Sequence, residues 1–165
     1  MEVWTIYPSP VGELLLTADE AGLTGIRMDR KIPSDACNRE DSPLFEPVRN
    51  WLEAYFRGED PAMDTVPLHL SGTSFQLQVW QILMQIPRGC TVTYGQIAKQ
   101  IALHRGMQTM SSQAVGQAVG ANPISILIPC HRCVGSNGKL TGYAWGLDKK
   151  IWLLRHEGIL KEELK

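Results

Sequence analysis

The sequence predicts an α+β protein in which a small N-terminal lobe, a short antiparallel sheet plus one helix, precedes a mainly helical C-terminal lobe. Short apolar runs separated by turn residues occupy residues 3–28, and apolar residues recur at helical spacing through most of the remainder. A turn-rich stretch, residues 60–74, separates the two patterns. A length of 165 residues allows one domain or two small lobes. We therefore expect lobes over residues 1–70 and 71–165.

The N-terminal lobe contains the predicted sheet. Three strands are expected, over residues 3–8, 13–18 and 22–28, with the turn Ser-Pro-Val-Gly between the first two. The polar residues 29–42 are expected to form a loop. Apolar side chains at helical spacing then predict a helix over residues 43–57, with Ser42 as its cap, Pro43 in its first turn and Gly58 after its end.

The C-terminal lobe is expected to be built from helices. They are predicted over residues 74–86, 93–103, 111–121 and 147–157, the last one ending at Gly158. The second and third of these, joined by a loop, resemble a helix-turn-helix. The third contains mostly small residues, and each internal glycine destabilises a helix by about 1 kcal/mol relative to alanine. Either close approach to DNA or tight packing on another helix would explain such a smooth surface.

Charge is distributed unevenly along the chain. Residues 1–70 hold 6 Lys+Arg and 13 Asp+Glu, a balance of −7, whereas residues 71–165 hold 10 and 4, a balance of +6. A basic second part indicates a polyanionic partner such as nucleic acid, although charges also segregate by chance.

The composition is that of a globular protein in a reducing compartment. No apolar run approaches the ~20 residues that span a bilayer, and the N-terminus lacks a basic start followed by an apolar stretch. We therefore expect a cytoplasmic protein without membrane contact, in which the four cysteines are free thiols.

The motif Pro129-Cys130-His131-Arg132-Cys133 admits several interpretations. A Cys-x-x-Cys redox pair usually opens a helix in a βαβ unit, but a turn-rich segment follows here. A structural zinc ion needs four ligands, and no second Cys/His cluster lies nearby. Two buried cysteines without chemistry, or one nucleophile with its base beside it, remain as alternatives.

The nucleophile interpretation makes specific chemical demands. A thiol with a pKa of about 8.5 is only about 7% ionised near pH 7.4, so a base must help to form the attacking thiolate. His131 can take the proton, and a water relay is favoured because adjacent side chains often point apart. Glu157 is the candidate that orients His131, with Asp148 as the other option.

Several motifs together resemble one family. "TSFQLQVWQILMQIPRGCTVTYGQIA", "QAVGQAVGANPISILIPCHR" and "SILIPCHRCVGSNGKLTGYAWGLDKKIWLLRHEG" are similar, in order and spacing, to the O6-alkylguanine-DNA alkyltransferases, also called methylated-DNA–protein-cysteine methyltransferases. The resemblance covers at least residues 73–158. It implies a DNA repair protein, an S-methyltransferase that flips O6-alkylguanine, chiefly O6-methylguanine, from duplex DNA and transfers the alkyl group irreversibly to a cysteine in a single turnover.

The resemblance also implies roles for individual residues. Cys130 would be the acceptor, His131 the base acting through water, and Glu157 the residue that orients His131. Asn122 would brace the turn before the active-site loop. Tyr94 would help to swivel the target phosphate and would donate a hydrogen bond to the departing guanine.

The remaining implied positions form two sets. DNA contacts are expected from Tyr94, Ser112, Gln113, Ala114, Gly116 and Arg132, the last of which also supports the active-site loop. The substrate pocket is expected to include Pro129, Cys133, Val134, Tyr143, Ala144 and Trp145. No metal and no cofactor are expected. The expected partner is double-stranded DNA carrying O6-alkylguanine, bound by a monomer, with cooperative binding along DNA left open.

Two positions depart from the family pattern. Gln113 stands where the family commonly has an arginine that fills the space left by the flipped base, so we expect weaker DNA affinity with repair retained. Trp145 stands where the family has glycine, so we expect a narrower pocket that disfavours bulky benzyl adducts. The alternatives are a non-catalytic module that binds alkyl lesions and, less favoured, a Cys130/Cys133 dithiol redox protein.

Overall fold

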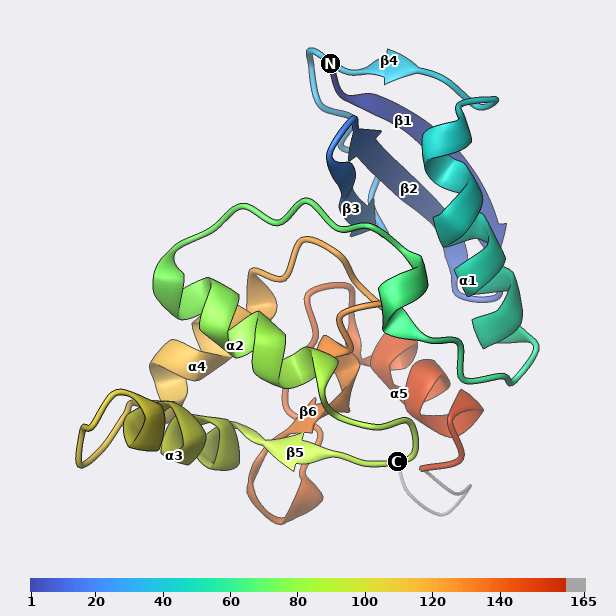
Figure 1. Cartoon of the computed structure of the whole chain (residues 1–165). Coiled ribbons are helices and arrows are strands. Elements are labelled where there is room, and N and C mark those ends of the chain that lie inside the picture. Colours follow the sequence, from blue (N-terminus) through green and yellow to red (C-terminus); the bar gives the residue numbers. More distant parts are fainter. Residues whose placement is uncertain (160–165) are drawn as a thin grey trace. The chain divides into compact units, whose positions relative to one another are not determined.

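The computed structural model describes residues 1–159, which form two compact units. Unit 1 comprises residues 1–70 and 123–125, and unit 2 comprises residues 71–122 together with the chain from 126 onward. Unit 1 contains a sheet and a helix, and unit 2 is mainly helical (Figure 1), so the predicted α+β class is confirmed. Within the described part of the chain, no helix is long and apolar enough to cross a membrane.

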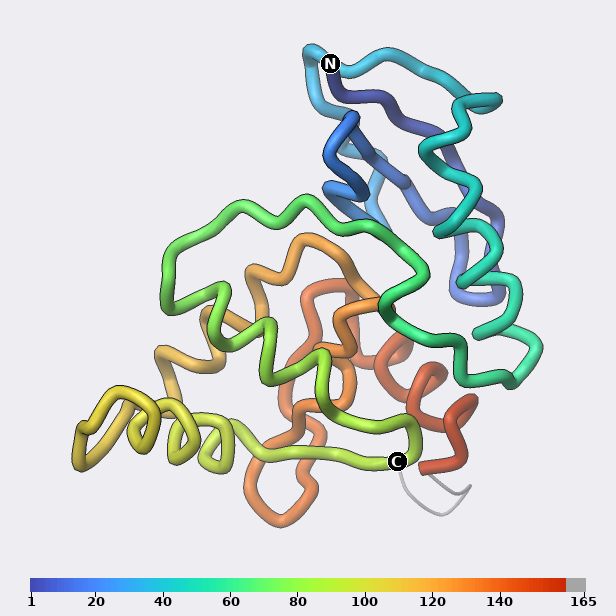
Figure 2. Tube along the Cα trace, in the orientation of Figure 1, coloured from blue at the N-terminus to red at the C-terminus, as the bar shows by residue number. Residues whose placement is uncertain are grey.

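A four-stranded sheet forms the centre of unit 1. Its strands are β1 (Val3–Ser9), β2 (Gly12–Asp19), β3 (Gly22–Arg27) and β4 (Cys37–Asn38), in the order β3-β2-β1-β4. The predicted hairpin and third strand are present, as the Cα trace shows (Figure 2). Strand β4 was not expected, because residues 29–42 were predicted to be a loop. It pairs in parallel with β1 over only two residues, which is too short to produce a periodic pattern.

Strand β3 is completed by two segments that come from later in the chain. Leu23 N donates to the carbonyl of Pro67 at 2.8 Å, and His69 N donates to the carbonyl of Leu23 at 2.8 Å. Farther along, Ile26 N donates to the carbonyl of Pro123 at 3.0 Å. Residues 123–125, which the sequence assigned to the second lobe, therefore pack with unit 1.

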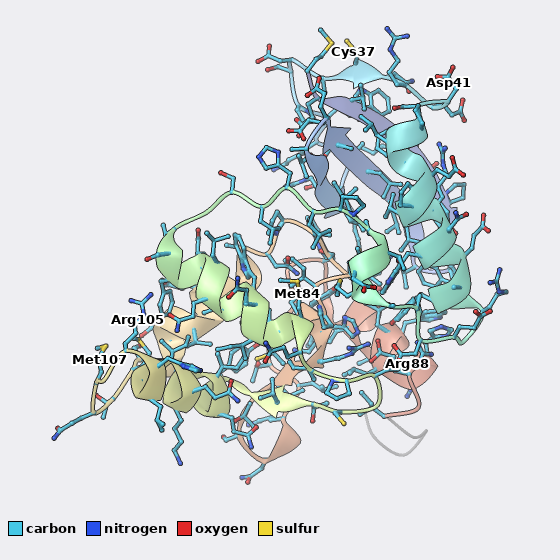
Figure 3. The ribbon with its side chains drawn as sticks, in the orientation of Figure 1. Cys37, Asp41, Met84, Arg88, Arg105 and Met107 are labelled. Atoms are coloured by element: carbon cyan, nitrogen blue, oxygen red, sulfur yellow. The ribbon has the colours of Figure 1, made fainter. Side chains whose placement is uncertain are left out.

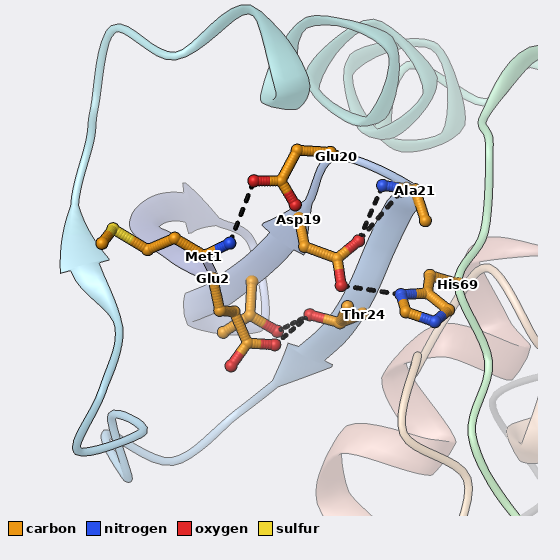
Figure 4. A network of polar contacts seen from close by, with 9 residues as sticks. Met1, Glu2, Asp19, Glu20, Ala21, Thr24 and His69 are labelled. Atoms are coloured by element: carbon orange, nitrogen blue, oxygen red, sulfur yellow. Dashed lines mark hydrogen bonds and ion pairs between the residues drawn. The ribbon is translucent and has the colours of Figure 1, made fainter.

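The turn between β2 and β3 is held by a polar network (Figure 4). One oxygen of Asp19 accepts from the backbone N–H groups of Ala21 and Gly22, and the other lies 2.7 Å from Nδ1 of His69. The amino group of Met1 donates to Glu20 at 2.9 Å. These contacts fix the start of β1, the β2–β3 turn and the connector that leaves unit 1.

The helix of unit 1 begins with one tight turn, η1 (Pro43–Phe45), and continues as α1 (Glu46–Phe56). Ser42 caps it as predicted, its hydroxyl accepting from Leu44 N at 3.3 Å. Gly58 follows the last turn with φ of 96°, a conformation that favours glycine. The buried side chains of α1 are Val48, Trp51, Leu52 and Tyr55. A further tight turn, η2 (Met63–Thr65), lies in the connector to unit 2.

Unit 2 begins with three helices that pack on one another. They are α2 (Ser74–Met84), α3 (Tyr94–His104) and α4 (Ser112–Gly120). Reciprocal hydrogen bonds between Thr73 and Gln76 cap α2, and a second such capping box begins α3. The indole N–H of Trp80 donates to the carbonyl of Ala118 at 2.9 Å, which fastens α4 to α2. Figure 3 shows Arg105 and Met107 where the chain leaves α3.

The rest of unit 2 contains the predicted active-site segment. It comprises the tight turn η3 (Cys130–Arg132), strand β6 (Cys133–Val134), the turn η4 (Ser136–Gly138) and helix α5 (Leu147–His156). Strand β6 pairs in parallel with β5 (Val92–Thr93), a ladder that the sequence did not indicate.

Candidate active site

The segment that leads to Cys130 is buried and partly strained. Ile126 is 1% exposed and has a φ of 73°, in the left-handed region that is a genuine outlier for a β-branched residue. Such a conformation persists only where the surroundings hold it. Asn122 provides one such restraint, since its side-chain amide donates to the carbonyl of Ile128 at 2.8 Å. Asn122 thus braces the chain shortly before the turn η3.

Cys130 itself begins a tight turn that is held at both ends. Cys133 N donates to the carbonyl of Cys130 and closes the turn. The β5–β6 ladder then aligns Val92 with Cys133 and Thr93 with Val134. Because Tyr94 directly follows Thr93, this two-residue ladder brings the start of α3 beside the turn η3.

Glu157 is placed by the end of α5. Gly158 adopts a φ of 79°, and the backbone N–H groups of Gly158 and Ile159 donate to the carbonyls of Arg155 and Leu154. This is the Schellman arrangement, in which glycine takes the left-handed position that other residues adopt at a cost. The sequence His-Glu-Gly therefore ends the helix at Glu157, whose carboxylate reaches His131 and Arg132 of the turn η3.

His131, Arg132 and Glu157 form a buried network. Nε2 of His131 lies 2.7 Å from one carboxylate oxygen of Glu157, and the guanidinium of Arg132 donates to both oxygens at 2.8 and 3.1 Å. The side chains of His131 and Glu157 are fully buried. Arg132 also donates to the carbonyl of Ile86 at 2.6 Å, which anchors the turn to the end of α2. Arg88, labelled in Figure 3, donates to the carbonyl of His156 and anchors the end of α5.

The charges in this network follow from burial and pairing. Burial opposes ionisation of Glu157, but hydrogen bonds and charges from His131 and Arg132 outweigh it and hold the pKa of Glu157 well below its ordinary value. Burial is also the largest influence on His131 and lowers the pKa of the imidazole, although Glu157 opposes this. We conclude that Glu157 is ionised and His131 is a neutral base. Nδ1 of His131 is buried and makes no hydrogen bond to any residue from 1 to 159.

Cys130 is buried, with 7% of the residue exposed. Burial raises the pKa of Cys130, and this effect is opposed by a hydrogen bond from Asn122 and by the positive charge of Lys150. Each of these groups stabilises the thiolate relative to the thiol. Burial therefore keeps Cys130 a neutral thiol at rest, and these groups reduce the cost of forming its thiolate.

Tyr94 connects the helices to this site. Burial raises the pKa of Tyr94, which keeps the phenol protonated, and its side chain hydrogen-bonds Thr141. A Cβ atom built on Gly116 would lie 3.8 Å from the Tyr94 ring, so the ring packs beside α4. The structure thus brings together Tyr94 and Gly116, two residues for which sequence reasoning suggested DNA contacts.

The outer face of α4 is polar and smooth. Ser112, Gln113, Gln117 and Gly120 are exposed, while Ala114 and Gly116 are half-buried. A Cβ on Gly120 would meet nothing within 4 Å. The glycine at position 120 is therefore not explained by packing inside the protein.

The predicted pocket residues differ in exposure. Pro129, Cys133 and Val134 are buried, Tyr143 and Trp145 are half-buried, and Ala144 is exposed. The expected DNA contact of Arg132 does not fit the geometry, because this side chain is only 8% exposed and its guanidinium binds Glu157 and Ile86. Arg132 instead supports the loop.

Sequence reasoning missed two polar residues, Thr141 and Lys150. Lys150 is completely buried, and its ammonium donates to the carbonyls of Cys133 at 2.7 Å and Gly142 at 2.9 Å. The burial of Lys150 could have been inferred from its position in the helix. It lies three and four residues before the buried Leu153 and Leu154, on the inward face of α5. Thr141 carried no comparable signal in a turn-rich stretch.

Comparisons with known proteins agree on one family. A family model described as "6-O-methylguanine DNA methyltransferase, DNA binding domain" matches residues 74–159, and one described as "6-O-methylguanine DNA methyltransferase, ribonuclease-like domain" matches residues 3–70. A methylated-DNA–protein-cysteine methyltransferase from Methanosarcina acetivorans is 46% identical over 158 residues, which cover 94% of this chain and 97% of the relative. A protein of the same name from Haemophilus influenzae is 42% identical over 159 residues, covering 94% and 86% of the two chains.

Solved structures give the same result. The crystal structure of Mycobacterium tuberculosis OGT in complex with DNA aligns with a TM-score of 0.82 at 37% identity, covering 98% of this chain and 96% of that chain. The crystal structure of Mycobacterium tuberculosis O6-methylguanine methyltransferase also aligns with a TM-score of 0.82 at 37% identity, over 99% and 98% of the two chains.

Proposed function

Because this chain belongs to the 6-O-methylguanine DNA methyltransferase family, we propose that it repairs O6-alkylguanine, chiefly O6-methylguanine, by moving the alkyl group to Cys130. The chain is a DNA repair protein that binds DNA and transfers an alkyl group to one of its own cysteines. The alternatives of a lesion-binding module without chemistry and of a dithiol redox protein are set aside on this ground.

The observation that carries the assignment of Cys130 is the buried network beside it. Cys130 precedes a neutral histidine whose Nε2 is occupied by an ionised Glu157 and whose Nδ1 has no partner among the described residues. A base held in this way can accept a proton on Nδ1 while its other nitrogen stays bonded to the carboxylate. Cys90 is exposed and Cys37 is half-exposed, and among residues 1–159 the one buried histidine–carboxylate pair is that of His131 and Glu157.

The proposed reaction is a displacement at the alkyl carbon. The Cys130 proton passes through a water molecule to Nδ1 of His131, and the thiolate sulfur forms a bond to the alkyl carbon. The bond between that carbon and O6 breaks, and its electron pair stays with the guanine. The Tyr94 hydroxyl donates a hydrogen bond to the departing base, and the guanine finally holds the proton that Cys130 lost. The product is a thioether, which does not release the alkyl group, so each molecule acts once.

Access to the lesion requires that the base leave the duplex. We propose that the smooth face of α4 lies in a groove of the DNA, where small side chains allow close approach without sequence preference. Gln113 would occupy the space left by the flipped base. Because glutamine is shorter than arginine and uncharged, this contact is expected to be weaker than that of an arginine. Trp145 would narrow the pocket, so methyl adducts are accepted and benzyl adducts disfavoured.

The compartment and oligomeric state form part of the proposal. The acceptor must be a free thiol, and all four cysteines are free in the structure, which is consistent with a reducing cytoplasm. We propose that the protein acts as a monomer on double-stranded DNA.

Incubation with a duplex that contains one O6-methylguanine tests this function directly. Intact-mass spectrometry should show a gain of one CH₂ per protein molecule, and peptide mapping should place it on Cys130. An undamaged duplex serves as the control and should give no gain. Binding to the lesion without any gain in mass would contradict alkyl transfer.

Gly116→Ala tests the role of the smooth helix face. Alanine at this internal position favours the helix by about 1 kcal/mol, and its methyl group would sit in ordinary contact with Tyr94, so the melting temperature should rise slightly. Duplex affinity, measured by fluorescence anisotropy, should nevertheless fall several-fold because the methyl group separates the helix from DNA. Gly120→Ala is the matched control, and it should change affinity less because Gly120 lies at the far end of α4. Equal, unchanged affinities for both variants would argue against this face.

A further inference from the structure

Arg88 is not a member of the buried network around Glu157, but it contacts the chain directly beside it. Nη2 of Arg88 donates to the carbonyl of His156 at 3.1 Å, across a sequence separation of 68 residues. His156 immediately precedes Glu157, whose carboxylate binds both His131 and Arg132. The contact therefore restrains the backbone from which the central carboxylate of the network extends.

The end of α5 shows why a donor is needed at this carbonyl. The last carbonyls of a helix have no partner within the helix. In α5 the Schellman hydrogen bonds reach the carbonyls of Leu154 and Arg155. The carbonyl of His156, the last residue of the helix, accepts from Arg88 instead. A cation at this end also interacts favourably with the helix dipole. Arg88 is therefore a side-chain cap for the C-terminus of α5.

A short turn fixes the backbone that carries Arg88. Cys90 N donates to the carbonyl of Pro87 at 3.1 Å and closes a turn of four residues. Gly89, the third residue of this turn, has a φ of 87°, which glycine adopts without steric cost. Pro87 has a fixed φ because of its ring. The contact of Arg88 with His156 therefore ties the end of α5 to a rigid segment.

The same connector also holds the other side of the network. Arg132 donates to the carbonyl of Ile86 at 2.6 Å and to Glu157 at 2.8 Å. Ile86 is buried and lies two residues before Arg88. Hydrogen bonds and chain thus form a closed ring that passes through Ile86, Arg132, Glu157, His156 and Arg88. This ring holds the carboxylate of Glu157 from two sides, through the guanidinium that it binds and through its own backbone.

The position of Glu157 matters because its carboxylate orients the base. Nε2 of His131 lies 2.7 Å from Glu157, and both side chains are fully buried. A shift of the carboxylate would turn the imidazole and redirect Nδ1, the nitrogen that accepts the proton in the proposed reaction. Misplacement of a reacting group by about 1 Å can slow a reaction about a hundredfold, so the loss of one restraint should have a smaller but measurable effect.

We infer that Arg88 is a positioning residue, whose guanidinium fixes the end of α5 so that Glu157 holds His131 in the orientation that alkyl transfer requires. This inference rests on the proposed function, since it concerns the same base. Arg88 exchanges no proton in this scheme and acts through the backbone of His156.

Three variants separate positioning from general stabilisation of the fold. Arg88→Met removes the donor and keeps much of the side-chain volume, whereas Arg88→Lys keeps a cationic donor. Arg49→Met is the matched control, because Nη2 of Arg49 donates to the carbonyl of Glu40 at 2.6 Å, a contact of the same kind in unit 1. The readouts are the single-turnover rate of methyl uptake at saturating O6-methylguanine duplex and the Kd for that duplex, at a temperature where every variant is folded.

Arg88→Met should slow methyl uptake at saturating duplex about tenfold and leave the Kd unchanged. Arg88→Lys should recover most of the rate, and Arg49→Met should keep the wild-type rate even if its melting temperature falls. A wild-type rate in Arg88→Met, or a loss that Arg88→Lys does not recover, would overturn the inference. A weaker Kd with an unchanged rate at saturation would overturn it as well, since Arg88 would then be a DNA contact.

A second measurement needs neither DNA nor alkyl transfer. The proton on Nε2 of His131, which faces the ionised Glu157, should give a downfield resonance in the proton NMR spectrum of the wild type near neutral pH. This resonance should shift or broaden in Arg88→Met and stay unchanged in Arg49→Met. An unchanged resonance in Arg88→Met would contradict the inference. The spectrum thereby distinguishes failure of the inference from failure of the proposed repair reaction, which the wild-type mass gain reports.

Discussion

Cys130→Ser is expected to abolish methyl uptake from O6-methylguanine DNA completely. A serine hydroxyl is a weak nucleophile at neutral pH. It is also a much weaker acid than a thiol, so His131, paired with Glu157, is not a strong enough base to ionise it. The substitution changes one buried atom, so the protein should still fold and bind duplex DNA. Intact-mass spectrometry after overnight incubation is the measurement, with duplex affinity as evidence that binding persists.

Cys133→Val is the matched control for this experiment. Cys133 is completely buried and its carbonyl, not its thiol, binds Lys150, so a similar apolar side chain should preserve the turn. The variant should take up one methyl group at close to the wild-type rate. Methyl uptake that survives in Cys130→Ser and is lost in Cys133→Val would reverse the assignment of the acceptor.

Glu157→Gln is expected to cause the second-largest loss, because one carboxylate serves two partners. Its removal leaves the buried guanidinium of Arg132 without an opposite charge, and breaking a buried ion pair in this way costs about 3 kcal/mol or more. His131 also loses the anion that stabilises its protonated form during proton transfer. Since a general base contributes at least about a hundredfold to a rate, we expect methyl transfer to slow by about that factor.

The stability loss in Glu157→Gln should depend on pH in a defined direction. The pKa of Glu157 is lower in the folded protein than its ordinary value of 4.5, so its stabilisation is complete above that value and disappears as the pH falls through the folded pKa. The difference in unfolding free energy between wild type and variant should therefore be constant near neutral pH and shrink below about pH 4.5.

Urea denaturation of both proteins at several pH values measures this difference. Glu53→Gln is a suitable control, since Glu53 is exposed on α1 and its replacement should change the unfolding free energy little. A Glu157→Gln difference that persists unchanged in acid would mean that its carboxylate is not ionised in the native network.

His131 adds to the acid sensitivity of the wild type. Burial lowers the pKa of the His131 imidazole below 6.5 in the folded protein. As the pH falls below that value, the imidazole is therefore protonated in the unfolded chain before it is protonated in the folded one. Wild-type stability should therefore begin to fall below about pH 6.5, before Glu157 contributes.

Long elements with a clear period could be predicted from the sequence. The three antiparallel strands, the helix capped by Ser42 and the helix that ends at Gly158 all carry local signals, which are apolar spacing, a capping side chain and a glycine after the last turn. The pairing of His131 with Glu157 was also anticipated, because α5 was the nearby source of carboxylates.

Features that arise from contacts between distant segments could not be predicted. The ladders between Val92–Thr93 and Cys133–Val134, and between β1 and β4, involve two residues on each side, and a two-residue strand has no period. Ile126 has a positive φ, which a β-branched residue rarely adopts by itself, so this conformation depends on the surrounding chain. Lys150 was not singled out as a site residue, because the burial of its ammonium depends on where the loop around Gly142 lies.

The hydrogen bonds between Ile26 and residues 123–125 have a consequence for synthesis on the ribosome. The first three strands and α1 emerge early, but the partner that completes the outer edge of β3 emerges only after most of unit 2 has been made. During this interval part of the nascent sheet edge stays unpaired, and such edges readily pair with other chains. A fragment that ends after residue 70 would keep that open edge permanently. Unit 1 therefore cannot be completed until residues 123–125 have been synthesised.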